Sequence, residues 1–133
     1  MSAMTYATLK NAELARRLGI SPEDARTLRL AEGTLSKWGE LECGNSGLYA
    51  SYAIERDETT GKPFRVTYPH NGDAVRRVAI ADREAGALKR IAEVCRRNGL
   101  YFYHQTDPRG VALYVAREPL NDQNYSRAYA VGE

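Results

Sequence analysis

The sequence predicts an α+β fold with an N-terminal helical hairpin, an antiparallel β-sheet of hairpins, and one further helix packed on one sheet face. Apolar residues recur at helical spacing over residues 1–43 and again over 82–98. Between and after these segments, within residues 48–131, they alternate with period two, as in half-buried strands. Helices and strands in separate runs are typical of α+β architecture.

The chain has 133 residues, the length of one domain, and its 43% hydrophobic content is sufficient for a packed core. We therefore expect a single domain over residues 1–133. Its helical part covers residues 1–43, and the strands, with the helix at 82–98, occupy residues 48–131.

End signals delimit the two N-terminal helices. The first ends at Gly19, and the second begins at Ser21, a good N-cap followed by Pro22 at the first helical position. The second helix continues toward Cys43, and Gly33 weakens its middle, so a break at Gly33 is the alternative. The expected buried positions of the first helix are Leu9, Ala12, Leu14, Ala15 and Leu18.

The remaining elements are predicted from the spacing of apolar residues and from the residue types that are typical of turns. A first hairpin alternates over 48–54 and 64–68 around a turn at 59–62, and a short strand follows at 75–80. The third helix has Asp82 as its cap and Asn98-Gly99 as its stop. Its buried stripe is Ala85, Leu88, Ile91, Ala92 and Cys95, and a last strand covers 124–131.

A second hairpin is predicted over residues 100–116, where two apolar runs flank a turn at Asp107-Pro108-Arg109-Gly110. If Thr106 faces Val111, Tyr103 faces Tyr114. One face is then apolar, with Phe102, His104, Val111, Leu113 and Val115. The other carries Tyr101, Tyr103, Gln105, Ala112 and Tyr114.

Composition limits the function classes. Nineteen basic against seventeen acidic residues give a net charge of only +2, too balanced to identify a nucleic-acid partner. Two cysteines are too few for a disulfide framework or for the about four ligands of a structural zinc site. No signal peptide or apolar run of roughly 20 residues is present, so we expect no membrane partner and a location in the host cell cytoplasm. We expect no cofactor and no metal.

The second half of the chain resembles a group of small bacteriophage and prophage accessory proteins. The resemblance covers roughly residues 35–131. It implies a mobile-element origin and, for such proteins, a role in host takeover, regulation or anti-defence. The matching segments are WGELECG (38–44), IERDE (54–58), ADREAGALKR (81–90), YHQTDPRG (103–110), ALY (112–114) and NYSR (124–127).

The tyrosine face of the second hairpin is the favoured binding surface. Tyrosine and arginine are preferred anchors of protein interfaces, and tyrosines also stack on unpaired bases while arginines reach phosphates. Tyr125 and Tyr129 could extend this surface. A half-buried sheet packed against the helices is the plain structural alternative. The candidate binding residues are Tyr101, Tyr103, Gln105, Arg109, Tyr114, Arg117 and Arg127.

Residues 13–21 followed by the second helix also fit a helix-turn-helix motif, which would present Arg26, Thr27 and Arg29 to DNA. Two acidic residues, Glu23 and Asp24, stand at the end that usually contacts bases, where they would repel phosphates. An ordinary helical hairpin explains the same pattern.

Catalytic signals are poor, and we expect a non-enzymatic protein. His104, Asp107 and Glu84 could be drawn into an acid–base site, but nothing in their spacing brings them together. We expect a binding protein that acts on a host protein, plausibly as an anti-defence or host-takeover inhibitor. The alternatives are a nucleic-acid-binding regulator and a small nucleotide- or nucleic-acid-processing enzyme.

Overall fold

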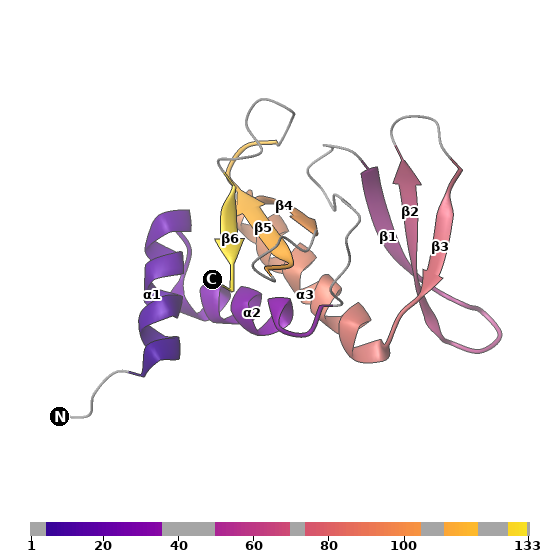
Figure 1. Ribbon diagram of the computed structural model, residues 1–133, viewed down its shortest axis with the longest axis horizontal. Coiled ribbons are helices and arrows are strands. Elements are labelled where there is room, and N and C mark those ends of the chain that lie inside the picture. The colour runs from indigo at the N-terminus through magenta and orange to yellow at the C-terminus, as the bar shows by residue number, and fades with distance from the viewer. Residues whose placement is uncertain (1–4, 36–49, 70–73, 105–110, 120–127, 133) are drawn as a thin grey trace.

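The computed structural model describes residues 5–35, 50–69, 74–104, 111–119 and 128–132. The α+β class is confirmed (Figure 1). The described strands form two three-stranded antiparallel sheets, β1-β2-β3 and β4-β5-β6, where we expected one sheet. The elements are α1 (Tyr6–Leu18), α2 (Pro22–Glu32), β1 (Ala50–Arg56), β2 (Pro63–Pro69), β3 (Arg76–Ala79), α3 (Asp82–Asn98), β4 (Tyr101–His104), β5 (Leu113–Ala116) and β6 (Tyr129–Val131).

The predicted boundary between α1 and α2 is confirmed. Helix α1 ends at Gly19, whose φ of +69° is left-handed and favours glycine. The Ser21 hydroxyl accepts a hydrogen bond from the Asp24 amide at 3.0 Å, so Ser21 caps α2. The predicted burial of Leu9 is wrong, because 52% of this residue is exposed on the outer side of α1.

Helix α2 is shorter than expected. It ends at Glu32 with Gly33 as its C-cap, and residues 33–35 are not helical, so the helix does not run on to Cys43. The break falls at the glycine that weakens helix propensity. Leu35, which lies beyond the end of the helix, is nevertheless buried. Residues 36–43 lie outside the described part of the chain.

The first hairpin, β1 and β2, closes through side-chain bonds in its turn. The Asp57 carboxylate accepts hydrogen bonds from the Thr59 and Thr60 amides, both at 2.9 Å. The bonds from Thr60 and Thr59 hold the pKa of Asp57 below its ordinary value because they stabilise the charged form. Gly61 takes a φ of +72°, and its amide donates to the Asp57 carbonyl at 2.8 Å.

The N-cap of helix α3 lies one residue earlier than we predicted. Ala81 is the N-cap, without a side-chain bond, and Asp82 is the first helical residue. The Asp82 carboxylate instead pairs with Arg56 on β1 at 3.0 Å, joining the helix start to the first sheet. Ala92 is exposed, contrary to the predicted stripe, whereas Leu88 is buried as predicted.

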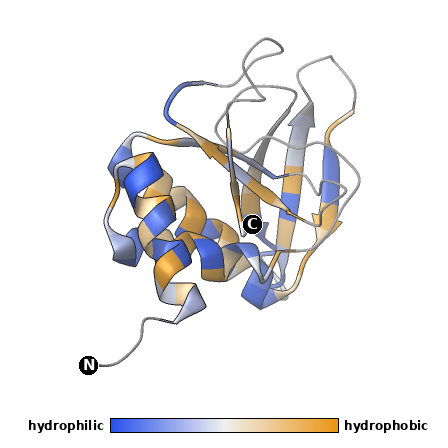
Figure 2. Ribbon diagram, turned by 60° about the vertical axis from the view of Figure 1, so that its left-hand side comes forward, coloured by the Kyte–Doolittle hydropathy of each residue, from blue (hydrophilic) through white to orange (hydrophobic). Residues whose placement is uncertain are grey.

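The register of β4 and β5 is confirmed. Tyr103 pairs with Tyr114, and Phe102 with Val115. The apolar face of this sheet packs on the three helices, which Figure 2 shows banded in blue and orange, as expected for helices with one buried face. The core includes Leu18, Leu28, Leu88, Ile91, Cys95, Phe102, Leu113, Val115 and Val131. The predicted turn at 107–110 lies outside the described residues, as do 124–127 of the last predicted strand.

Candidate functional site: a basic pocket between α1 and β6

The predicted tyrosine surface is an intramolecular stack. The rings of Tyr103 and Tyr114 lie 4.9 Å apart with 7° between their planes. Tyr103 is only 4% exposed, while Tyr101 and Tyr114 are half-buried. Tyr129 lies on the opposite face of the sheet, because it pairs with Val115. Tyr103 is therefore too buried to serve as an exposed anchor, and Tyr129 does not extend the face that carries Tyr101 and Tyr114.

Arg117 stabilises helix ends. Its Nη2 donates to the carbonyls of Leu18 and Gly19, the latter at 3.2 Å, and its Nη1 donates to the Asn98 carbonyl at 3.2 Å. These carbonyls end α1 and α3, where helix dipoles place partial negative charge. The guanidinium that we expected to reach a partner is thus engaged within the molecule. Gln105, Arg109 and Arg127 lie outside the described residues.

Two of the three candidate DNA-contacting residues on α2 make hydrogen bonds within the protein. Arg29 Nη1 donates to Asn11 Oδ1 at 2.8 Å and to the Ala7 carbonyl at 3.1 Å, both on α1. The Thr27 hydroxyl donates to the Glu23 carbonyl at 3.1 Å. Arg26 is exposed.

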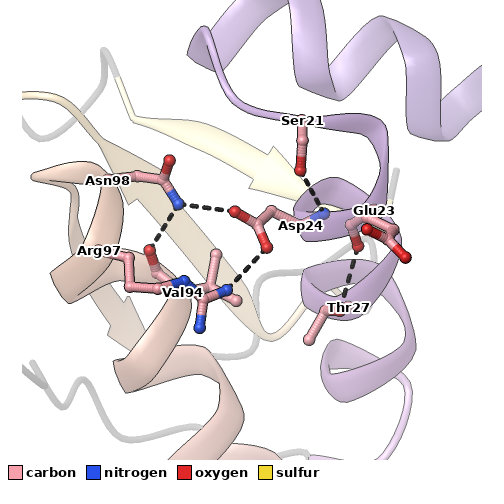
Figure 3. A network of polar contacts seen from close by, with 7 residues as sticks. All are labelled: Ser21, Glu23, Asp24, Thr27, Val94, Arg97 and Asn98. Atoms are coloured by element: carbon pink, nitrogen blue, oxygen red, sulfur yellow. Dashed lines mark hydrogen bonds and ion pairs between the residues drawn. The ribbon is translucent and has the colours of Figure 1, made fainter.

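The start of α2 is docked on α3 (Figure 3). Asp24 accepts hydrogen bonds from Arg97 at 2.8 Å and from Asn98 at 3.0 Å. Asn98 also donates to the Val94 carbonyl at 2.8 Å, which fixes its amide. A recognition helix needs its first turn free for the major groove. Here Asp24, in that turn, is bonded to α3, so the geometry favours an ordinary helical hairpin.

A pocket opens where α1 and α2 meet the edge strand β6. Three cations converge on it, namely Lys10, Arg17 and Arg29. Arg17 also borders an adjoining surface hollow with Arg117 and Glu118. The pocket lining is Lys10, Glu13, Leu14, Arg17, Arg29, Tyr129, Ala130 and Gly132.

The cations of this basic pocket differ in what they contact. Arg17 lies over the Tyr129 ring, 5.7 Å from its centroid, and makes no ion pair with any described residue. Lys10 lies 5.5 Å from the Tyr6 ring centroid and 3.8 Å from a Glu13 carboxylate oxygen. The pocket therefore keeps an excess of positive charge beside an aromatic ring.

The sequence contains part of this arrangement. Tyr6, Lys10, Glu13 and Arg17 follow the i, i+4, i+7, i+11 spacing that places residues on one helix face. We missed Lys10 and Arg17 because the apolar stripe, and not the polar face, defined the helix. No sequence pattern links them to Tyr129, which reaches the pocket through the pairing of β6 with β5.

Two side chains with reactive groups, His104 and Cys95, lie in the core. His104 is fully buried beside Leu113, as its face predicted. Burial raises the pKa of the Cys95 thiol to about 12, so at neutral pH it is a thiol and a poor nucleophile. Within the described ranges, no three His, Cys, Asp or Glu side chains come close enough to hold a metal ion.

No family model, curated protein or solved structure matches this chain. None of the described helices is both long and apolar enough to cross a bilayer.

Proposed function

We propose that this is a non-enzymatic accessory protein of the kind encoded by phages and prophages, which acts in the host cytoplasm by binding a host protein. The basic pocket, together with the outer face of α1, forms the binding surface. The observation that carries the proposal is Arg17, a cation without an ionic partner among the described residues, positioned beside Tyr129 at the pocket. An anti-defence or host-takeover role, by occupying the surface of a host effector, fits this mode of action.

The composition of the surface favours a protein over a nucleic acid. Glu13 lies among the cations, and its carboxylate would repel a continuous phosphate backbone. Two apolar side chains are exposed on the same helix, Tyr6 at 68% and Leu9 at 52%. A mixed surface of aromatic, aliphatic and basic groups is typical of protein interfaces.

A nucleic-acid partner is the second candidate, supported by the three cations at the pocket and the exposed Arg26 on α2. The two candidates differ in salt dependence. Binding through several phosphates weakens steeply as salt rises because counterions are released, whereas a protein interface with rim charges responds less.

Capture from a host lysate with nuclease treatment tests the proposal. The wild-type protein should retain a defined protein partner after nuclease, and Arg17→Glu should lose it. Lys89→Glu is the matched control, because Lys89 is an exposed cation on α3 that does not line the pocket. Equal capture by Arg17→Glu and wild type would contradict the assigned surface. Tight, salt-sensitive binding to labelled oligonucleotides would favour the nucleic-acid candidate.

A further inference from the structure

We infer that the basic pocket takes a single carboxylate group, supplied by an aspartate or glutamate side chain of the partner protein. This inference rests on the proposed function and specifies the chemistry that the partner must offer. It follows from three properties of the pocket: a prearranged guanidinium, a second guanidinium without an ionic partner among the described residues, and a lining of net positive charge.

Arg29 is the prearranged group. Its Nη1 is held by Asn11 Oδ1 and the Ala7 carbonyl, which fixes the plane of the guanidinium against α1. Its Nη2 and Nε donate no hydrogen bond to another described residue. A guanidinium held in place loses little side-chain entropy when it binds a carboxylate, and its planar fork matches the carboxylate oxygens.

Arg17 supplies the second guanidinium. It has no carboxylate partner among the described residues, and its contact with the Tyr129 ring orients it without neutralising its charge. An arginine that lies over an aromatic ring can still donate in its own plane. Arg17 and Arg29 line the same pocket from different helices, so one carboxylate can interact with both.

Glu13 lowers the positive charge of the pocket without cancelling it. It lies 3.8 Å from Lys10 and lines the pocket with the two arginines. The lining thus carries three cations and one carboxylate. The net charge of the lining is therefore positive, and its attraction for one carboxylate exceeds the repulsion from Glu13. An acidic side chain is the anionic group that a protein partner supplies, so an aspartate or glutamate carboxylate of the partner complements this pocket.

The test uses small anions as probes and the intact protein. Sodium acetate and sodium phosphate are titrated separately at constant ionic strength, with sodium chloride as reference. Nuclear magnetic resonance then follows the Arg17 and Arg29 Nε–H signals and the amides of Ala130 and Gly132. We expect acetate to shift these signals more strongly than chloride does.

Two variants make the test specific. Arg17→Gln should weaken acetate binding by about fivefold, the change that corresponds to an exposed ion pair of ~1 kcal/mol, and Lys89→Gln should leave it unchanged. Glu13→Gln should raise the affinity for phosphate more than the affinity for acetate. Acetate shifts no larger than those with chloride, or an acetate affinity that Arg17→Gln leaves unchanged, would overturn the inference.

The outcome separates this inference from the proposed function. If acetate binds at Arg17 but partner capture is insensitive to Arg17→Glu, the proposed binding surface is wrong. The partner's carboxylate is then not the ligand of this pocket. If partner capture depends on Arg17 but acetate produces no specific shift, the proposed function stands and the carboxylate inference is overturned.

Discussion

At the scale of the residue, Glu32 is a buried carboxylate whose position depends on a distant glycine. It is 7% exposed, and its Oε1 accepts a hydrogen bond from the Ala112 amide at 3.1 Å. Gly132 packs against it with a φ of +93°. A Cβ on Gly132 would collide with Glu32 Oε2 and lie 2.8 Å from its Cδ. The link therefore joins the end of α2 to the residue that precedes β5 and to the residue that follows β6.

Gly132→Ala should lower the free energy of unfolding by about 2–4 kcal/mol, because it combines backbone strain with a clash against a buried carboxylate. Gly99→Ala is the control, since its φ is +65° and a Cβ there meets nothing within 4 Å. Strain alone should cost the control about 1 kcal/mol. Denaturant unfolding measures the free energy of unfolding of both variants. Equal decreases would contradict a contribution from the contact with Glu32.

Cys95 gives a prediction about pH. Its folded pKa of about 12 exceeds the ordinary value of 9.0 because burial disfavours the thiolate. Native Cys95 should therefore resist iodoacetamide at pH 8 and react after unfolding, as site-resolved mass spectrometry would show. As pH rises above 9, the unfolded chain releases this proton and the folded protein retains it, so stability falls. Rapid native labelling of Cys95 would contradict its burial.

At the scale of the element, Arg117 stabilises the C-terminal ends of two helices. Glycine at the αL position ends each helix, Gly19 for α1 and Gly99 for α3. The last carbonyls have no partner inside a helix, and Arg117 binds those of Leu18, Gly19 and Asn98. One side chain following β5 thus joins three elements.

Arg117→Ala should lower the free energy of unfolding by about 1–2 kcal/mol, the range for hydrogen bonds from a charged donor reduced for partial exposure. Arg16→Ala is the matched control, because Arg16 lies in the last turn of α1 and is exposed. Thermal unfolding compares them. If the two variants unfold at the same temperature, the contribution of these carbonyl contacts is negligible.

At the scale of the whole molecule, α3 connects the two sheets. It begins at the first sheet, through the Arg56–Asp82 ion pair, and extends beneath the second sheet (Figure 1). Its buried side contributes Leu88, Ile91 and Cys95 to the main core. Its C-terminal end holds α2 through Arg97 and Asn98. Changes to this helix should therefore affect the entire fold.

Leu88→Ala should lower the free energy of unfolding by about 2–5 kcal/mol, because it leaves a cavity in a packed core. Leu88 is 2% exposed, whereas Leu30 on α2 is 59% exposed. The same truncation at Leu30 should change stability by only about 0.5 kcal/mol. Chemical denaturation measures the free energy of unfolding of both variants. A decrease for Leu88→Ala as small as that for Leu30→Ala would contradict the central role of α3.

The sequence by itself determined the features that depend on neighbouring residues. The N-cap at Ser21, the helix ends at Gly19 and Gly99, and the facing of Tyr103 and Tyr114 were all predictable. Caps arise from bonds within one turn, and pairing across a hairpin follows from the alternation of side chains. The end of α2 was less certain, because Gly33 lowers helix propensity without compelling a break.

Tertiary structure alone decided how distant segments meet. The division of the strands into two sheets, the burial of Tyr103 and the capture of Arg117 by helix carbonyls depend on packing between elements far apart in sequence. The basic pocket has the same origin, since Arg17 and Tyr129 lie at opposite ends of the chain. Charged side chains follow no apolar period, so their convergence is set by the core that orients the helices and β6.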